Sequence, residues 1–408
     1  MRQSDARAPN PGPVVPRTDQ AMRTRHPLRI CIDARSPGRG GIATYATNLI
    51  DYLLQIDPDN YYLLLIDPDQ RSRARPGIDE IIVPAGNPLQ WFIWSNTRLP
   101  RLLREHRIDV YHTLKHVTAF RIPARAMATL HGAEMIYRLP WAYTWYDLLY
   151  WRTVYSIAAR RYDRLLTATD CEMQFFAARK RIPQEKFRTT ALAAATRFQK
   201  ISDPVRLAEA RRRLALPSRF ILFVGRMHTI KNLERLVMAF ARARPRLPDS
   251  MHLVLTGAAS GTYHRRLVRL VEQLGIGDRV QFTGEITDEL PLLFNLAEAF
   301  VLISLYENFG LVLLEAMASG TPVITSAIAD IDEVVGQAAV RVSPTDVDAI
   351  CDALVDVVGS PELRQDLAAR GLDQARRFSW ERCARETLDV YRELAAAMPA
   401  VPAMVDAG

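Results

Sequence analysis

The sequence lacks any long hydrophobic run, and no stretch approaches the roughly 18 apolar residues that a membrane-spanning helix needs. It has only four cysteines, and the spacing of Cys31, Cys171, Cys351 and Cys383 matches no metal-binding or redox motif. We therefore expect reduced cysteines and a cytoplasmic protein. Residues 1–27 contain no continuous apolar segment, so we expect no signal peptide there.

Two kinds of recognition motif are also missing. Neither half carries a GxGxxG fingerprint with an acidic residue about 20 positions further on, which argues against a dinucleotide-dependent oxidoreductase. No recognisable nucleic-acid reading module accompanies the net charge of +8, so we expect no nucleic-acid partner.

The composition is that of a soluble globular protein. With 408 residues, 49% of them hydrophobic and 24% charged, the chain is long enough for two domains of ordinary size. Its net charge favours anionic partners such as nucleotide diphosphates or an anionic lipid surface. Residues 1–27 contribute +3 of the +8 and are rich in proline and arginine, which predicts a disordered basic tail.

The stretch Ser304–Ser326 concentrates the chemistry. Two short apolar runs, AFVLISL and TPVITS, have the length of buried strands, and a helix of about ten residues fits between them. Glu315 is the only charged residue between Asn308 and Ala329, and an unpaired buried charge costs several kcal/mol. Glu315 is therefore predicted to face a polar ligand or an internal partner. The backbone N–H groups of Gly310, Leu311 and Val312 would offer an anion site at the start of the helix.

The same residues resemble a known family. The pattern Ser-x-x-Glu-x-Phe-Gly-Leu-x-x-Leu-Glu-Ala-Met-Ala-x-Gly-x-Pro-Val is similar to the signature of the retaining glycosyltransferases of family 4. The resemblance extends from Leu28 to about Ala395. It implies the α/β fold called GT-B, in which two Rossmann-like, doubly wound domains face each other across a cleft and a C-terminal helix crosses back to the first domain. It also implies that the cleft closes by a hinge motion when substrate binds.

This fold predicts the domain boundaries. The alternation of strand and helix patterns is interrupted by a polar, basic segment, which we interpret as a hinge or linker at residues 199–217. The predicted units are a tail at 1–27, an N-terminal acceptor-side domain at 28–198, a C-terminal nucleotide-sugar-binding domain at 218–375, and a crossing helix with a frayed tail at 376–408.

In the first domain, LRICIDAR is predicted to be the first strand. Gly40 and Gly41 follow it, and their backbone can approach a phosphate. The resemblance implies that this loop borders the donor diphosphate and the acceptor. His131 follows an apolar run at the end of another strand. In the family a cleft histidine at this place contacts the donor sugar, although the next residue is commonly Asp and here it is Gly132.

In the second domain, Gly225, Arg226 and Lys231 follow a buried strand. An arginine fork and a lysine point charge five positions apart could both reach one diphosphate. The motif Gly-Arg-x-x-x-x-Lys-Asn is similar to the donor-diphosphate motif of the family. Gly284 and Ile286 end a further strand, where the resemblance implies backbone contacts to the base.

The chemistry assigns a role to each group. Arg226, Lys231 and the amides around Gly310 and Leu311 would stabilise the leaving diphosphate, and Glu315 would bind the ribose hydroxyls. Glu307 would face the sugar hydroxyls or the anomeric centre, without being a nucleophile. We predict His131, Arg226, Lys231 and Glu307 as catalytic residues, with Asn308 and Phe309 completing the donor site. Because no Asp-x-Asp stands out at a comparable strand end and the cations could replace a metal, we predict no metal and no cofactor.

The substrates are predicted from weaker resemblances. IDAR, Gly-Gly-Ile-x-x-Tyr, WFIW and DVYH are similar to segments of bacterial mannosyltransferases of surface-polysaccharide assembly. They favour GDP-mannose as donor, with a UDP-hexose next, and a glycan or lipid-linked glycan as acceptor. A degenerate, non-catalytic nucleotide-sugar-binding protein is the alternative, although the motif cations and carboxylates are all present.

Residues 136–155 are unusually aromatic, with Trp141, Trp145 and Trp151. Aromatic residues interspersed with arginines suit stacking on a sugar, contact with the inner face of a membrane, or packing within the domain. All three interpretations remain open from the sequence.

Overall fold

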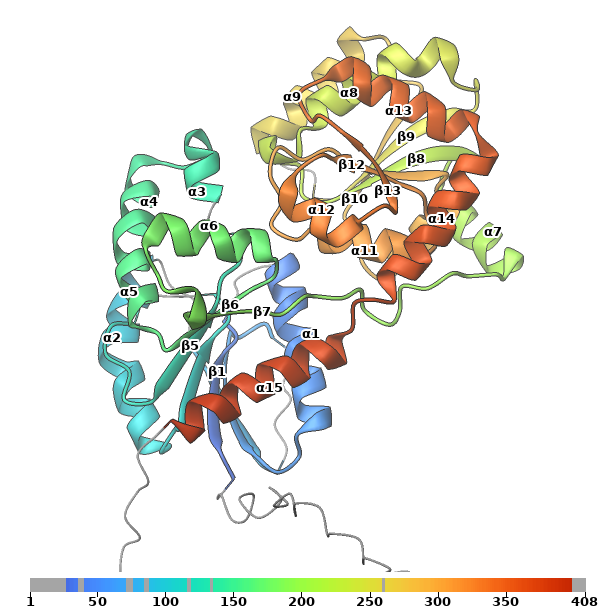
Figure 1. The fold of residues 1–408 in the computed structure, drawn as a ribbon. Coiled ribbons are helices and arrows are strands. Elements are labelled where there is room, and N and C mark those ends of the chain that lie inside the picture. The colour runs from blue at the N-terminus through green and yellow to red at the C-terminus, as the bar shows by residue number, and fades with distance from the viewer. Residues whose placement is uncertain are drawn as a thin grey trace, which may run out of the picture.

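The computed structural model describes residues 27–35, 40–70, 76–83, 88–115, 119–132, 135–258 and 261–397. The predicted basic tail, apart from Pro27, and the predicted frayed end at 399–408 lie outside the described residues. The chain forms two lobes, each built around one parallel sheet (Figure 1).

The first sheet has seven parallel strands in the order β3-β2-β1-β4-β5-β6-β7. Its strands read as near-continuous apolar runs because helices cover both faces. Their bounds are β1 (Arg29–Asp33), β2 (Tyr61–Ile66), β3 (Ile78–Ile82), β4 (Val110–Thr113), β5 (Arg125–Thr129), β6 (Arg164–Thr167) and β7 (Phe187–Thr189). The helices of this lobe are α1 (Gly41–Ile56), α2 (Pro88–Glu105), α3 (Met135–Arg138), α4 (Trp145–Tyr150), α5 (Ser156–Arg161) and α6 (Asp170–Lys180).

Alternate side chains of β1 separate two cores. Ile30 and Ile32 pack with α1 on one face, whereas Cys31 packs with α2, α5 and α6 on the other. Successive side chains of a strand point to opposite faces, so one buried strand serves both layers. None of the four cysteines, all of which lie in the described part of the chain, forms a disulfide.

The second sheet has six parallel strands in the order β10-β9-β8-β11-β12-β13. Their bounds are β8 (Arg219–Val224), β9 (Met251–Thr256), β10 (Val280–Gly284), β11 (Ala299–Leu302), β12 (Val323–Ser326) and β13 (Ala339–Val342). The helices are α8 (Leu233–Ala243), α9 (Gly261–Gln273), α10 (Leu290–Leu296), α11 (Leu311–Ala318), α12 (Ala329–Val335), α13 (Val347–Gly359) and α14 (Pro361–Ala375). The strand–helix–strand unit predicted at 304–326 is therefore formed by β11, α11 and β12.

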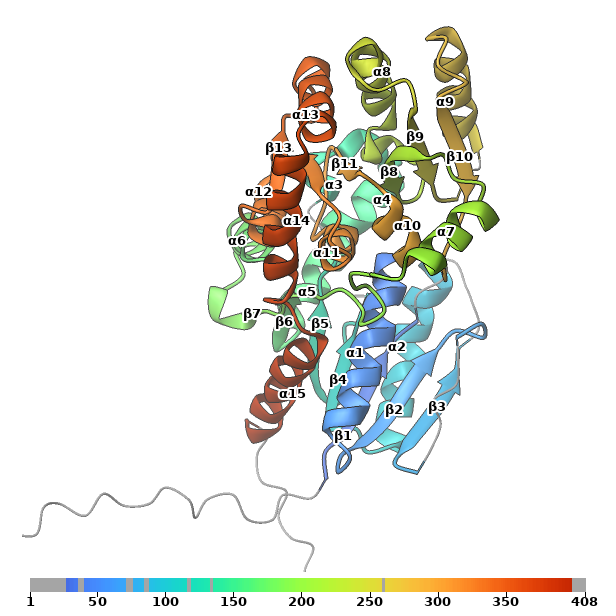
Figure 2. The same ribbon diagram turned by 90° about the vertical axis from the view of Figure 1, so that its right-hand side faces the viewer.

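The last helix, α15 (Trp380–Ala396), leaves the second lobe and packs against α1 and β4 of the first (Figures 1 and 2). A buried polar chain fixes it there. The hydroxyl of Tyr391 lies 2.7 Å from Nδ1 of His112, and Nε2 of His112 lies 2.8 Å from Oγ1 of Thr129. Two facing parallel sheets with a returning terminal helix confirm the GT-B fold.

The segment predicted as a linker, 199–217, contains a helix, α7 (Pro204–Arg213). Asp203 caps it by accepting hydrogen bonds from the N–H groups of Val205 and Arg206. Ala210 then packs with Leu292 of α10, so this part of the segment belongs to the packing of the second lobe. The Asp-Pro pair is a helix-start signal that the sequence interpretation passed over.

The start of the loop after β8 depends on a close backbone approach. Gly257, which follows β9, has φ +148°, and a Cβ built on it would lie 2.0 Å from the carbonyl oxygen of Gly225. Only glycine fits this position without moving the loop that begins at Gly225.

We predict that Gly257→Ala lowers the free energy of unfolding of the second lobe by about 1–3 kcal/mol, since overpacking forces a backbone shift. Urea denaturation followed by far-ultraviolet circular dichroism measures this. Gly359→Ala is the matched control, because a Cβ at Gly359 meets nothing within 4 Å. Equal stability of the two variants would contradict the prediction.

Candidate functional site

The predicted site residues gather where the two sheets face each other. His131 follows β5 of the first sheet, and Glu307 follows β11 of the second. The two loops touch: a Cβ built on Gly132 would lie 3.1 Å from Cβ of Asn308 and 3.4 Å from the hydroxyl of Tyr306. Ligands of parallel α/β sheets bind outside the carboxyl ends of the strands, which is where these residues lie.

Lys231 and Glu307 form an ion pair across the loops after β8 and β11. Both side chains are largely buried, with 25% and 12% of their surface exposed. The hydroxyl of Ser304 donates to the same oxygen of Glu307 at 2.7 Å. Lys231 is therefore not an isolated cation: a diphosphate bound to it would be held beside the carboxylate that the sequence placed near the sugar.

Asn232, which the sequence analysis left out of the site, locks the Lys231 loop. It is buried with left-handed backbone angles, φ 59° and ψ 32°. Its side-chain amide donates to the carbonyls of Ile303 at 3.0 Å and Pro344 at 2.6 Å. The signal was present as the Asn of the Lys-Asn pair in the diphosphate motif.

Arg226 is exposed at the mouth of the same loop. The pKa of His228 is lowered first by burial and then by the nearby charges of Arg226 and Lys231, so its imidazole adds no positive charge at neutral pH. The positive charge of this short loop comes from Arg226 and Lys231, and two such cations suit a diphosphate.

The helix α11 begins at Gly310, which has φ +69°, and a Cβ there would lie 2.6 Å from Cδ1 of Leu313. Glycine therefore lets the chain turn into the helix and present the amides of Leu311 and Val312 at its N-terminus. Phe309, predicted as a donor-binding residue, has its side chain in the core, 4% exposed, with its ring edge-on to Phe378. Its side chain packs inside the domain, so only its backbone could face a ligand.

Glu315 sits on α11 and is buried. Within the described residues its carboxylate has no hydrogen bond and no ion pair. Burial raises its pKa to about 8, and the charge of Arg197, just before the linker, opposes this only in part. A buried carboxylate without an internal partner could accept hydrogen bonds from the hydroxyl groups of a ligand.

His131 is neutral at physiological pH. Burial lowers its pKa to about 4, and the nearby charge of Lys115 lowers it further, while a hydrogen bond to the backbone of Leu114 acts in the opposite direction. Its Nε2 atom is buried with no hydrogen-bond partner in the described structure. The ring stands edge-on to Tyr45, with centroids 4.6 Å apart. The imidazole can therefore exchange a hydrogen bond with a ligand through Nε2.

The remaining predicted glycines lie at the rims. Gly40 and Gly41 begin α1 and have open space around them. Gly284 ends β10 with φ +74°, and its carbonyl accepts from the N–H of Gly257 at 2.8 Å. Ile286 is partly buried against the core. Lys115, at the end of β4 and electrostatically coupled to His131, is a further cation of the first domain that no sequence motif indicated.

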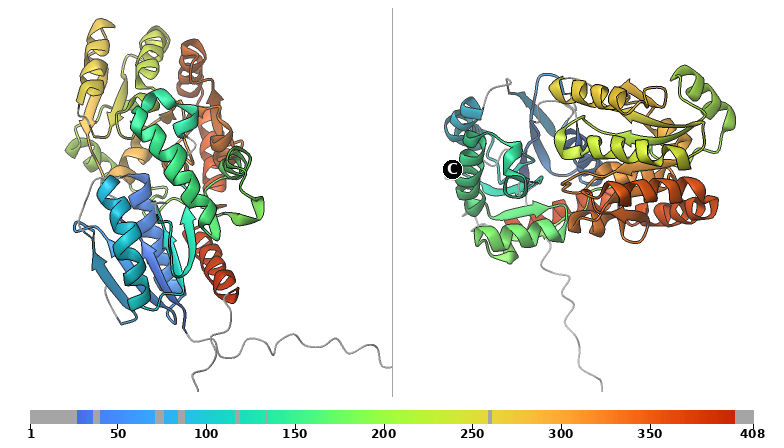
Figure 3. Two further views of the ribbon diagram at one scale, coloured as in Figure 1. Left: turned by 90° about the vertical axis from the view of Figure 1, so that its left-hand side faces the viewer. Right: turned by 90° about the horizontal axis from the view of Figure 1, so that it is seen from above.

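The aromatic segment divides into two parts. Trp151 packs against Tyr155 and the core of the first domain. Trp141, between α3 and α4, and Trp145, at the start of α4, are 59% and 76% exposed. The helices α2, α4 and α5 lie on the outer side of the first domain (Figure 3). The packing interpretation holds for Trp151 and does not hold for the other two.

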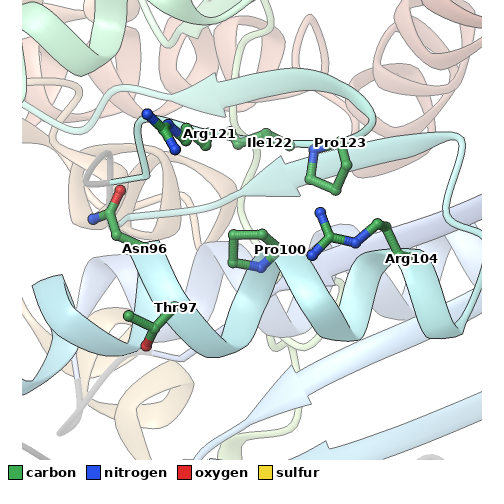
Figure 4. A pocket seen from close by; sticks show the side chains of 7 residues that line it. All are labelled: Asn96, Thr97, Pro100, Arg104, Arg121, Ile122 and Pro123. Atoms are coloured by element: carbon green, nitrogen blue, oxygen red, sulfur yellow. The ribbon is translucent and has the colours of Figure 1, made fainter.

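A hollow of about 370 Å³ opens on this side, between α2 and the segment 119–124 (Figure 4). It is lined by Asn96, Thr97, Pro100, Arg104, Arg121, Ile122 and Pro123. It is not formed by the residues of the candidate site.

The described residues hold no group of three or more His, Cys, Asp or Glu side chains placed to bind a metal ion. No helix among them combines the length and the apolar character required to cross a bilayer.

Comparisons with known proteins agree with this arrangement. A family model described as Glycosyltransferase Family 4 matches residues 39–190, and one described as Glycosyl transferases group 1 matches residues 208–374. O-antigen chain mannosyltransferase B of Escherichia coli is 30% identical over 297 residues, which is 72% of this chain and 76% of that protein. Further curated relatives are matched over less than half of their own length.

Solved structures are similar in fold. Sucrose-phosphate synthase from Thermosynechococcus elongatus has a TM-score of 0.74 at 22% identity, covering 91% of this chain and all 100% of that chain. HepE of Anabaena, solved in complex with UDP and glucose, has a TM-score of 0.72 at 16% identity, covering 90% and 100%. Since the two family models match both lobes and the Escherichia coli relative aligns over most of its length, the chain belongs to the glycosyltransferases of family 4.

Proposed function

We propose that this glycosyltransferase moves a mannosyl group, with retention of configuration and without a metal, from GDP-mannose to a glycan or lipid-linked glycan acceptor. The product would belong to a cell-surface polysaccharide. The observation that carries the proposal is the donor half-site: Lys231 paired with Glu307, beside a buried Glu315 that has no partner in the described structure. The mannosyltransferase name of the 30% identical relative supports mannose and the polysaccharide product.

In the proposed reaction the bond between the anomeric carbon and the diphosphate oxygen breaks. Negative charge then develops on the leaving diphosphate, and Arg226, Lys231 and the amides at the start of α11 stabilise it, with one such donor contributing about 3 kcal/mol. The acceptor hydroxyl attacks the same face of the sugar, and its proton passes to the departing phosphate. Neutral His131 binds a sugar hydroxyl through Nε2, which has no partner in the described residues.

The cations of the loop after β8 support the proposed metal independence. In a metal-dependent transferase a divalent ion neutralises the diphosphate. In this chain Arg226 and Lys231 occupy the loop after β8 and supply positive charge to the same group. Because the carboxylate of Glu307 neutralises the charge of Lys231, most of the positive charge left for the diphosphate comes from the exposed Arg226.

A UDP-hexose is the second candidate donor. Its support is the fold similarity to HepE, whose structure was solved with UDP and glucose. Gly284 and Ile286 at the end of β10 are where we expect the base to be read through the backbone, and backbone contacts do not distinguish guanine from uracil by residue type. The choice between the donors therefore rests on experiment.

The test is thermal stabilisation by GDP, UDP and ADP and their common sugar conjugates, in EDTA. A ligand at one hundred times its dissociation constant adds about 2.7 kcal/mol to the stability of the native state. We expect GDP and GDP-mannose to raise the melting temperature, and transfer from GDP-mannose to persist in EDTA. A strict requirement for Mg²⁺ or Mn²⁺ would refute metal independence, and no stabilisation by any nucleotide would favour a degenerate binding protein.

We predict that nucleotide affinity rises with pH between pH 7 and pH 9, by about tenfold. Both oxygens of Glu315 can accept hydrogen bonds from the ribose only when the group is ionised, and its pKa in the unliganded protein is raised to about 8. Binding therefore releases a proton below pH 8, and the cost of that release disappears as the pH rises through the pKa. Isothermal titration calorimetry in buffers of different ionisation enthalpy measures both the affinity and the proton.

Two matched variants test whether Glu315 or Glu307 causes the pH dependence of nucleotide affinity. Glu315→Gln should bind nucleotide more weakly and lose the pH dependence. Glu307→Gln should keep the affinity and its pH dependence but lower turnover. The reverse ranking would exchange the roles of the two glutamates.

We also propose that the outer side of the first domain rests on an anionic membrane surface, which would bring a lipid-linked acceptor to the cleft. Large apolar side chains are exposed there beside exposed arginines of α2 and the segment 119–124. The apolar members are Leu89, Ile93, Trp141, Trp145 and Leu149, and the basic members are Arg98, Arg101, Arg104 and Arg121. Apolar anchors combined with cations suit an anionic interface.

We predict that Trp141→Ala with Trp145→Ala weakens flotation with phosphatidylglycerol vesicles by at least about tenfold, since each side chain would leave an apolar environment. Val205→Ala on α7, at a position 65% exposed, is the control for loss of an exposed apolar side chain elsewhere. Equal flotation of all three proteins would remove the membrane contact.

A further inference from the structure

The helix α6 of the first domain begins with a capping arrangement. Oγ1 of Thr169 accepts from the N–H of Glu172 at 3.1 Å, and a carboxylate oxygen of Glu172 accepts from the N–H of Ala168 at 3.3 Å. The spacing Thr-x-x-Glu is that of a capping box, although here the glutamate accepts from the residue before the cap. Glutamate side chains are seldom fully buried. Glu172 instead has no exposed surface. Capping alone does not explain why a carboxylate is buried at this place.

The other contacts of Glu172 reach both halves of the candidate site. Its Oε1 accepts from the N–H of Gly132 at 2.8 Å, next to His131. With the Asn308 amide nitrogen turned toward it, that nitrogen lies 3.0 Å from Oε1 and 3.1 Å from Oε2. Asn308 adjoins Glu307. One buried carboxylate therefore holds a loop of the first domain and a loop of the second.

We propose that Glu172 is a positioning residue for glycosyl transfer: its carboxylate fixes the His131 loop against the Glu307 loop in the closed arrangement of the two domains. The inference rests on the proposed function, because it assigns how that site is assembled. Glu172 itself touches neither the donor nor the acceptor in this proposal.

The position of α6 supports this role. The hydroxyl of Thr169 donates to Asp330 of the second domain at 2.8 Å. The N–H groups of Asp170 and Cys171 donate to the two carboxylate oxygens of Glu333 at 2.8 and 2.7 Å. The start of α6 is thus anchored on α12, so Glu172 keeps its place relative to the second domain while it holds Gly132 of the first.

The physical requirement is distance. The neutral imidazole and the Lys231–Glu307 pair lie on different domains, and a misplacement of about 1 Å can cost about 100-fold in rate. A carboxylate with several fixed donors holds such loops more firmly than a neutral side chain, since charge-assisted hydrogen bonds are shorter and stronger. Separating the domains would break the Asn308 contact, whereas the Gly132 contact lies within the first domain.

The test begins with Glu172→Gln, Asn308→Asp and the double variant. Asn308→Asp places two carboxylates face to face, and the double variant restores a carboxylate–amide pair with its members exchanged. We expect each single variant to lower kcat by about 10- to 100-fold, while Glu172→Gln changes the dissociation constant of the nucleotide far less. We expect the double variant to recover at least part of the loss. Wild-type kcat in Glu172→Gln, or no recovery in the double variant, would overturn the proposal.

Glu333→Gln is the matched control. It weakens the same helix end against the second domain without touching either site loop. A purely structural role for Glu172 predicts that Glu172→Gln and Glu333→Gln lower the melting temperature and kcat in parallel. Positioning predicts a larger kcat loss in Glu172→Gln at equal stability.

A measurement independent of activity separates this proposal from the proposed function. Residue-resolved hydrogen exchange reports the Gly132 amide, which donates to Glu172. We expect Asn308→Ala, a change in the other domain, to accelerate exchange at Gly132, and Glu333→Gln to do so less. If wild type turns over no donor, the proposed function fails and the exchange result still decides the contact. Unchanged exchange at Gly132 in Asn308→Ala would overturn the role of Glu172.

Discussion

The ion pair between Lys231 and Glu307 joins two loops whose members are 76 residues apart in sequence. Around it, Asn232 fastens the Lys231 loop to the backbone beyond β11, and Ser304 donates to the same carboxylate. A buried pair is favourable only when its remaining hydrogen-bonding capacity is satisfied. The loops after β8 and β11 therefore behave as one unit, and the proposed donor half-site is preorganised before a ligand arrives.

Glu315, further along the same motif, lacks the partners that Glu307 has. It is buried on α11 without an internal partner in the described structure, and its pKa is raised to about 8 by that burial. Burying this carboxylate costs free energy in the native state, and hydrogen bonds from a ligand's hydroxyls would reduce that cost. One glutamate of the motif is thus fixed by a cation, and the other remains available. Their different environments, rather than their chemistry, give them different roles.

The two domains meet through polar contacts and through the returning helix α15. Its Tyr391 begins a buried chain through His112 and Thr129 to Tyr45, whose ring stands against His131. The hydrogen-bonded chain therefore connects the terminal helix to Tyr45, and a ring contact connects Tyr45 to the cleft histidine. Burial keeps His112 neutral as well, with a pKa lowered to about 3, so this chain does not change charge near neutral pH.

The sequence by itself determined the alternating fold, the strand ends that carry His131, Lys231 and Glu307, and the isolation of Glu315, because these follow from local hydrophobic runs, glycine positions and short motifs. It did not reveal α7 inside the linker, the core position of the Phe309 side chain, or the division of the tryptophans into packed and exposed. Nor did it indicate Glu172, which looks like an ordinary helix cap. Only the tertiary structure decided these points, since burial and contact between domains depend on groups that are distant along the chain.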